Sequence, residues 1–445
     1  YWEVFSMSYH YLIDIALILL TTKVFGMITK RLQMPQVVGA LIAGLVMGPA
    51  MLNIIHSTEF LSQVSELGVI VMMFTAGLGT SLNDLKQTGK AGFLVALCGV
   101  IVPLIGGTIL SLFFNTSTDP NAFMQNVFIG VVLTATSVSI TVEALKEMGK
   151  LNTVVGNTIL AAALIDDVLG LIALTIVTSI GGSADANLLV VLLKIVAFFV
   201  LVVVVGIVVK KAMDWYIANV HSTDLQRYPI FAFILCLILS FCAEEFFGVA
   251  DITGAFAAGL IISTTSKAKY IELKFAPLSY LLLTPIFFAS IGLKVELPEM
   301  NATIVIFSIL LVVVAVLTKW IGCGLGAKLC GLKGHQCEQI GVGMVCRGEV
   351  ALIVADKGAA LGLMPEVFFG SVIIMVVATT ILTPILLKFA YRKSDAYEDM
   401  QESSLVDRYD EVEQLDYIGE SLIRANEHMM KKGKKAEKAA SETKK

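Results

Sequence analysis

Long apolar runs alternate with short polar connections along most of this 445-residue chain. About 20 consecutive apolar residues let a helix cross the hydrocarbon core of a bilayer, and most of the runs reach that length. The pattern predicts an all-α membrane protein with 13 transmembrane helices, the ninth short for a full crossing. The expected spans are residues 12–30, 35–55, 62–80, 91–114, 124–147, 154–181, 188–212, 226–247, 251–266, 275–294, 302–330, 338–362 and 368–391.

Composition supports this class. Hydrophobic residues make up 57% of the chain and charged residues only 15%, whereas soluble domains carry about 25% charged residues. The seven Cys form no CxxC pair and the five His are scattered, so we expect neither a disulfide framework nor a structural zinc. We expect no enzymatic activity, no cofactor and no nucleic-acid partner; the lipid bilayer is the surrounding that the sequence requires.

Positive charge is distributed unevenly among the connections. Those after odd-numbered spans carry two or three Lys or Arg each, whereas those after even-numbered spans carry only Lys294. Because Lys and Arg concentrate on the cytoplasmic side, this bias predicts an outside N-terminus, a cytoplasmic C-terminus and a multi-pass protein of the inner (plasma) membrane. The first run, without a basic residue before it or a cleavage site after it, is expected to be a transmembrane helix rather than a signal peptide.

An internal repeat is visible at an offset of 215 residues. The segment Gly39–Leu45 recurs as Gly254–Leu260, and Gly77-Leu78 recurs as Gly292-Leu293. Small residues also recur in membrane helices simply for close packing, but shared offsets over separate helices favour a true repeat. Spans 2–6 then correspond to spans 9–13 in inverted orientation. Inverted repeats are typical of secondary transporters whose sites lie at broken helices near the midplane.

The sixth span carries two adjacent acids, Asp166 and Asp167, in the middle of its apolar run. One Asp at a bilayer centre costs roughly 2.5 to 3.5 kcal/mol, and such residues usually mark an ion pathway or a proton relay. The alternative is a pair of carboxylates that merely hydrogen-bond neighbouring helices. In this part of the chain the repeat offset is 214, at which Gly156 and Ile159 match Gly370 and Ile373. The counterparts of the two acids are then Thr380 and Ile381, so the predicted ion or proton site belongs to one repeat only.

Two stretches at equivalent places in the repeats suit broken helices. Span 5 contains a hydroxyl-rich run that includes Thr134, Thr136 and Ser137, and hydroxyls can satisfy backbone groups freed by unwinding. Span 12 places Arg347 and Glu349 on either side of a glycine inside an apolar stretch. The alternatives are hydroxyls that only pack helices and an ion pair that only fixes a helix crossing.

Lys319 lies in the middle of span 11, where a buried ammonium needs a carboxylate partner or must lose its proton. Asp166 is the predicted partner, and a lysine that snorkels to an interface is the alternative. Lys23 and Lys194 lie in spans outside the repeats; we expect them to snorkel or to line a dimer face. Residues 392–445 form a cytoplasmic tail, for which we expect one amphipathic helix followed by disorder.

Together these residues resemble the monovalent cation:proton antiporter superfamily, most closely its electrogenic bacterial branch of sodium/proton antiporters with an Asp-Asp pair. The likeness covers about 35–391. Electroneutral relatives carry Asn before the Asp, and the potassium efflux relatives append a nucleotide-binding domain for which the tail is too short. The matching pieces are Ile165-Asp166-Asp167, Cys346-Arg347-Gly348-Glu349-Val350-Ala351, the segment 285–293 and Lys319.

The resemblance implies a homodimer. In each protomer residues 1–391 would form the transmembrane antiporter domain, with a core of about 91–181 and 302–391 and a dimerisation domain of about 12–80 and 188–294. The core would carry the ion across the membrane in an elevator-type movement. Asp167, with Asp166, would bind the transported cation; Asp166 would pair with Lys319. Thr134, Thr136, Ser137, Arg347 and Glu349 would belong to the unwound crossing helices.

The expected function is therefore exchange of Na⁺ (or Li⁺) for H⁺ by a secondary active antiporter. Two protons are expected to move for each cation, which would make the exchange electrogenic. The alternative within the superfamily is a K⁺/H⁺ antiporter or a potassium efflux system of the Kef type. Outside it, a gated potassium channel would need no buried Lys–Asp pair, and a membrane scaffold would have no use for two acids at mid-span. Selectivity among Na⁺, Li⁺ and K⁺ depends on carbonyl positions that composition does not determine.

Overall fold

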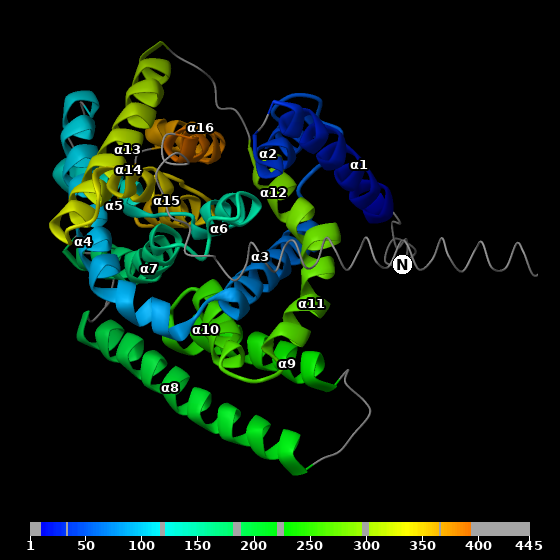
Figure 1. Ribbon diagram of the computed structural model, residues 1–445. Coiled ribbons are helices and arrows are strands. Elements are labelled where there is room, and N and C mark those ends of the chain that lie inside the picture. The colour runs from blue at the N-terminus through cyan, green and yellow to red at the C-terminus, as the bar shows by residue number, and fades with distance from the viewer. Residues whose placement is uncertain are drawn as a thin grey trace, which may run out of the picture. The chain divides into compact units, whose positions relative to one another are not determined.

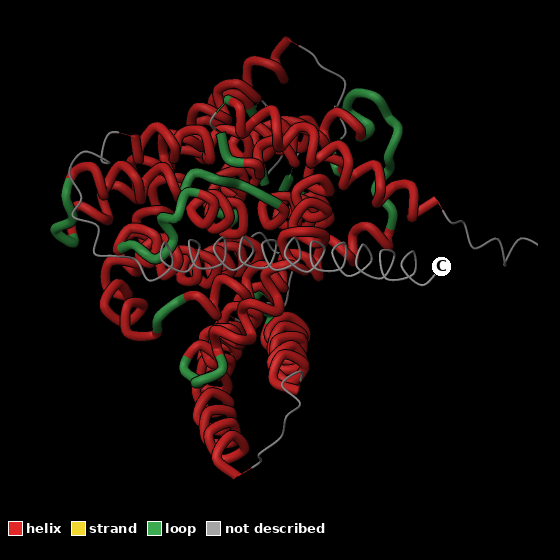
Figure 2. The backbone as a smooth tube through the Cα atoms, turned by 45° about the vertical axis from the view of Figure 1, so that its right-hand side comes forward, coloured by secondary structure: helices red, strands yellow, loops and turns green. Residues whose placement is uncertain are grey.

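The computed structural model describes residues 10–32, 34–115, 121–180, 188–219, 227–295, 302–364 and 366–392. Helices and their connecting turns account for all of these residues, and no strand occurs among them (Figures 1 and 2). The predicted helix and disorder of the cytoplasmic tail lie outside the described residues. An all-helical fold suits a bilayer, because an α-helix pairs its backbone N–H and C=O groups within its own segment.

The helices follow the apolar runs in order. Among the described residues, ten are long and apolar enough to cross a membrane when interrupted helices such as α5 and α6 are taken as one, and α2 and α10 are shorter. The count of 13 spans stays a prediction. The elements are α1 (His10–Arg31), α2 (Gln36–Met47), α3 (Glu59–Gly79), α4 (Leu82–Phe114), α5 (Ala122–Thr134), α6 (Val138–Glu147), α7 (Val154–Ile180), α8 (Leu188–Asn219), α9 (Arg227–Cys242), η1 (Ala243–Phe247), α10 (Asp251–Ser263), α11 (Ala268–Leu278), η2 (Ser279–Leu283), α12 (Thr284–Leu293), α13 (Ala302–Leu329), α14 (Gly334–Gly343), α15 (Glu349–Ala360) and α16 (Glu366–Arg392).

Helix ends differ from the predicted spans where local chemistry overrides hydropathy. The predicted span 35–55 is helical only to Met47. Gly48 is followed by Pro49, and a proline disfavours the α conformation of the residue before it. Conversely, α4 begins at Leu82, nine residues before the apolar run, because its polar first turns contain no proline. A π-helical turn, η2, follows Pro277 in α11, as expected where a proline removes a backbone donor.

Two close helix crossings depend on glycine. At Gly44 of α2 and Gly292 of α12, an added Cβ would run into the backbone of the other helix. Gly77 of α3 and Gly259 of α10 meet in the same way. Small residues of this kind let membrane helices approach backbone to backbone. Under the predicted offset of 215, Gly44 corresponds to Gly259 and Gly77 to Gly292.

The helices gather in two groups, which Figure 1 separates clearly. The first contains α4–α7 and α13–α16, with α4 packed against α13, α5 and α7, and α13 packed against α14 and α16. The second contains α1–α3 and α8–α12, in which α2 packs on α1 and α12, and α10 packs on α3 and α9. The candidate site lies in the first group, where two discontinuous helices interrupt the bundle.

Candidate ion-binding site

Two interrupted helices cross near the middle of the first group. The helix of α5 ends at Thr134 and resumes as α6 at Val138, whereas α14 ends at Gly343 and α15 begins at Glu349. The two extended segments touch directly: the Ser137 N–H donates to the Cys346 carbonyl at 2.9 Å. An added Cβ at Gly348 would lie 2.6 Å from Ser137 Oγ, so the crossing has room only for glycine there.

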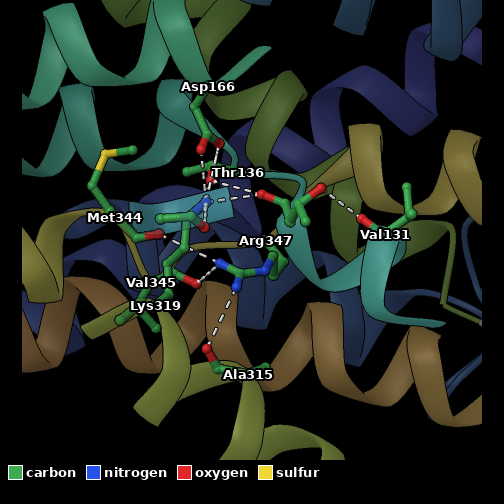
Figure 3. Close-up of polar contacts among 10 residues, drawn as sticks. Val131, Thr136, Asp166, Ala315, Lys319, Met344, Val345 and Arg347 are labelled. Atoms are coloured by element: carbon green, nitrogen blue, oxygen red, sulfur yellow. Dashed lines mark hydrogen bonds and ion pairs between the residues drawn. The ribbon is translucent and has the colours of Figure 1, made fainter. Parts of the chain in front are cut away.

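An ion pair lies beside this crossing. Lys319 of α13 is fully buried, and its Nζ lies 2.9 Å from Asp166 Oδ1 and 3.1 Å from Oδ2 (Figure 3). Thr136, in the extended segment after α5, donates its hydroxyl to Asp166 Oδ2 at 2.6 Å. Asp166 itself is 2% exposed. The negative charge of Asp166 is therefore neutralised and hydrogen-bonded within the protein.

Lys319 also satisfies two carbonyl groups that the helices leave open. Its Nζ donates to Gly99 O at 2.8 Å and to Thr134 O at 2.9 Å. In a regular helix Gly99 O would accept from residue 103, but Pro103 has no N–H. Thr134 is the last residue of α5, where carbonyls lack intrahelical donors. Lys319 thus joins α4, α5 and α7 through contacts with the Gly99 and Thr134 carbonyls and with Asp166, and all three donors of its ammonium are used.

Asp167 is placed differently from its neighbour. It is partly exposed, and its Oδ2 atom is buried without a hydrogen-bond partner among the described residues. Both acids line a cavity of about 610 Å³ bounded by α3, α5, α7, α15 and α16 and by the turn between η1 and α10. One carboxylate is thus paired and buried, whereas the next one along α7 lines the cavity and has an oxygen without a hydrogen-bond partner among the described residues.

Charged side chains continue along the cavity to the surface of the protein. Glu66 of α3, Glu244 of η1, Lys294 and Lys357 line it and are exposed. Asp251, at the first position of α10, also lines the cavity, and its Oδ1 accepts a hydrogen bond from the Ile252 N–H at 2.7 Å. The cavity therefore connects the Asp167 carboxylate with one face of the molecule.

Arg347 lies fully buried in the second extended segment (Figure 3). Its Nη1 donates to Val345 O at 2.7 Å and to Met344 O at 3.4 Å, and its Nη2 donates to Ala315 O at 3.4 Å. The guanidinium therefore sits where the carbonyls at the end of α14 lack donors and where the helix dipole is negative. Glu349 is the first residue of α15; its side chain lies outside the described part of the structure.

The structure thus brings together Asp166, Lys319 and Thr136, with Thr134 contributing its carbonyl rather than its hydroxyl. Ser137 and Arg347 lie in the crossing segments and contact neither Asp166 nor Lys319 by a hydrogen bond. Sequence reasoning missed the Gly99 carbonyl, although Pro103 four residues later signals it. It also missed the acids at the cavity, Glu66, Glu244 and Asp251, which no spacing rule connects. Among the described residues, no three His, Cys, Asp or Glu side chains cluster as metal ligands.

Comparison with known proteins identifies the family. The model for the sodium/hydrogen exchanger transmembrane family matches residues 16–393. The Na(+)/H(+)-K(+) antiporter GerN of Bacillus cereus is 40% identical over 390 residues, which are 87% of this chain and 98% of GerN. A Na(+)/H(+) antiporter of Enterococcus hirae is 33% identical over 385 residues, 85% of this chain and 97% of its own.

A solved structure shares the fold. The sodium proton antiporter MjNhaP1 from Methanocaldococcus jannaschii superposes with a TM-score of 0.67 at 18% identity, over 88% of this chain and 98% of that one. The likeness supports the helical membrane architecture. By the family match and the two relatives, this chain belongs to the sodium/hydrogen exchanger family within the monovalent cation:proton antiporters, and it is a membrane transporter rather than an enzyme.

Proposed function

We propose that the chain exchanges Na⁺ or Li⁺ for H⁺, and that Asp167 is the group for which the two ions compete. The observation that carries the proposal is the contrast between the two neighbouring acids. Asp166 is neutralised by Lys319, whereas Asp167 presents a carboxylate oxygen without a hydrogen-bond partner in the described structure, at a cavity that reaches the surface. A small hard cation takes oxygen ligands, and a proton on the same oxygen excludes it.

Competition for one carboxylate is sufficient to couple the two fluxes. A protonated Asp167 has no charge with which to hold a cation, and the positive charge of a bound cation lowers the affinity of Asp167 for a proton. If each ion can cross only while bound, the downhill flux of one drives the uphill flux of the other. The transported cation is substrate in this scheme, and the chain needs no resident cofactor.

The proposed electrogenicity rests on Lys319. A cation bound at Asp167 and drawn toward Asp166 would weaken the 2.9 Å contact between Asp166 and Lys319. Buried ammonium groups lose their protons when they lose their partners, because the charged form is poorly solvated. Lys319 would then release one proton and Asp167 another. Two protons would move for each cation.

Access to the site from one face at a time is the second requirement. The cavity is bordered by Glu66 near the beginning of α3, by Lys294 at the end of α12, and by Lys357 near the end of α15. With the orientation that the positive charges predict, all three lie toward the outside. We therefore assign the conformation to an outward-open state, in which Asp167 exchanges ions with the external medium.

The two helix groups support an elevator-type movement of α4–α7 and α13–α16 against the remainder. The glycine crossings Gly44–Gly292 and Gly77–Gly259 exchange places under the 215-residue offset, which is what an inverted repeat with two-fold symmetry would require. Within the resemblance, the second group would also form the homodimer. The outward faces of α1 and α8 carry large exposed apolar side chains, including Leu20 and Val203, together with the exposed Lys23 and Lys194. In a homodimer these faces would meet lipid or the partner.

The decisive test is Asp167→Asn in everted vesicles loaded with a pH-sensitive dye. The substitution preserves shape but removes the charge, so we expect Na⁺-driven dequenching to fall to the level of empty vesicles. Asp84→Asn, an exposed acid at the start of α4, is the matched control and should behave as wild type. Wild-type dequenching by Asp167→Asn would refute the proposed role of this carboxylate.

Exchange of K⁺ for H⁺ is the second candidate function, because both Na⁺/H⁺ and K⁺/H⁺ antiporters match this chain. GerN is a Na(+)/H(+)-K(+) antiporter, and the yeast K(+)/H(+) antiporter 1 is 28% identical over 429 residues, 89% of this chain and 48% of that protein. Solid-supported membrane currents recorded with equal concentrations of Li⁺, Na⁺ and K⁺ separate the candidates. Larger currents with K⁺ than with Na⁺ would replace the first proposal by the second.

A further inference from the structure

A further buried acid, which neither the Asp pair nor the cavity explains, lies in α6. Glu143 is 5% exposed, and its Oε2 accepts no hydrogen bond from any described residue. Its ion pair in this part of the structure is a long one, 3.8 Å to Nζ of Lys146 in the next turn. Burial of a carboxylate with so little compensation costs energy, and it is retained in membrane helices mainly at ion pathways.

The face of α6 on which Glu143 lies follows from its neighbours. Thr141 donates its hydroxyl to Gly343 O at 2.8 Å, which turns that side of α6 toward α14. With 3.6 residues per turn, Glu143 lies about 200° further round, on the opposite side. Helices α2 and α3 pack against α6 as well. Glu143 therefore faces the second helix group, across the interface at which the two groups would move.

Glu147, one turn further on and on the same face, bridges this interface. Its Oε2 accepts from the Gln36 N–H at 2.6 Å and its Oε1 from the Val37 N–H at 3.2 Å. These are the first donors of α2, and Pro35 before them provides no side-chain cap. A carboxylate from α6 thus takes the place of the missing cap and is favoured by the helix dipole. The contact therefore joins α6 of the first helix group to α2 of the second.

Polar groups connect this contact with the site. Ser137 and Ser139 Oγ lie 3.3 Å apart, and Ser139 is buried at the beginning of α6. Ser139, Glu143 and Glu147 follow one another at four-residue intervals, which places them along one face of the helix. The row begins at the crossing segments beside Thr136 and ends where the basic residues Lys146 and Lys150 predict the cytoplasmic side.

We propose that Glu143 is an intermediate binding site for the monovalent cation on the cytoplasmic half of the ion path, and that the contact between Glu147 and α2 closes this half in the conformation seen here. The inference rests on the proposed antiport function. Separation of α6 from α2 removes both donors of Glu147 and exposes Glu143 to water. A cation leaving Asp167 toward the cytoplasm then meets a second carboxylate before it is fully hydrated.

The first test measures the apparent KM for Na⁺ separately at each face. Everted vesicles receive Na⁺ at the cytoplasmic face and right-side-out proteoliposomes receive it at the outer face. Glu143→Gln should raise KM at the cytoplasmic face about tenfold, the effect of about 1.4 kcal/mol of lost binding, and leave KM at the outer face unchanged. Glu245→Gln, an exposed acid of η1, should change neither value. Equal KM changes at both faces, or none, would overturn the assignment.

The second test follows access to the position. In a variant without the seven native cysteines, Glu143→Cys should react with an impermeant cationic thiosulfonate from the cytoplasmic face, and Na⁺ should slow the reaction. A bifunctional cross-link between Gln36→Cys and Glu147→Cys should block both modification and exchange. Modification that ignores the cross-link would contradict the closure. Asp167→Asn separates this inference from the proposed antiport function. If Asp167→Asn abolishes exchange while both Glu143 tests fail, only the role of Glu143 is wrong.

Discussion

Removal of Lys319 tests whether the buried ion pair does more than hold helices together. In Lys319→Ala, Asp166 keeps its negative charge and loses its cation, so Thr136 is the one hydrogen-bond donor left to its carboxylate among the described contacts. Breaking a buried pair in this way costs about 3–5 kcal/mol. The Gly99 carbonyl loses its donor as well, at about 1–3 kcal/mol for a group left unsatisfied, and the Thr134 carbonyl keeps only the 3.4 Å contact with the Thr136 hydroxyl.

Part of this loss depends on the charge that remains, and a second substitution separates it. Asp166→Asn in the Lys319→Ala background removes the unpaired charge but leaves both carbonyls without their donor. We therefore expect the double variant to melt at a higher temperature in detergent than Lys319→Ala alone. The interaction energy between contacting charged residues is about 0.5–3 kcal/mol in double-mutant cycles. Additive losses in stability would refute the view that the pair acts as a unit.

Transport gives an independent readout of the same substitution. If Lys319 releases one of two protons, each turnover moves net charge. The exchange rate of the wild-type protein in proteoliposomes should then change when a potassium-diffusion potential is imposed, in a direction set by the sign of that potential. Lys319→Ala should retain slower exchange through Asp167 and lose this response. A variant that responds to voltage as the wild type does would show that the proton from Lys319 is not part of the cycle, whatever its stability.

Two further substitutions test the crossing and the support of Asp166. Gly348→Ala places a Cβ 2.6 Å from Ser137 Oγ and should abolish exchange in vesicles. The control Gly334→Ala, whose Cβ meets no atom within 4 Å, should exchange ions as the wild type does. Normal exchange by Gly348→Ala would mean that the crossing is looser than described. Thr136→Val removes the 2.6 Å hydrogen bond to Asp166 and should cost roughly 1–3 kcal/mol of stability, seen as a lower melting temperature. Thr136→Ser retains the donor and should melt near the wild-type temperature. Equal melting temperatures of the two variants would show that this hydrogen bond does not support Asp166.

Hydropathy predicted the order and approximate place of the helices, because the bilayer selects for apolar length and for little else. It failed where backbone chemistry decides. The end of α2 at Met47 follows from the Gly48-Pro49 pair, and the early start of α4 follows from a polar segment without a proline. The count of spans and the inverted repeat stay predictions, although the paired glycine crossings are arranged as that repeat requires.

The candidate site was predictable in its charges and not in its carbonyls. A charge inside an apolar run is costly wherever it lies, so Asp166, Asp167, Lys319 and Arg347 could be selected without a structure. The contacts of Arg347 could not be predicted in this way. Its partners are the backbone oxygens of Val345, Met344 and Ala315, and every residue type has such an oxygen. Their availability depends on where helices stop, and hydropathy leaves helix ends uncertain by several residues.

The same uncertainty concealed the connection between helix ends and function. Lys319 and Arg347 are both paired with carbonyls that a proline or a helix end has freed: Gly99 and Thr134 for the first, Val345 and Met344 for the second. Each unwound segment thus requires a buried cation for its own stability. In the proposed exchange, a cation near Asp166 would compete with Lys319 for the same carboxylate, so its binding would disturb the support of α4 and α5 along with the charge balance. Ion binding and the movement of the helix group would then be coupled through one side chain, since Lys319 is the point where the carboxylate and both freed carbonyls meet.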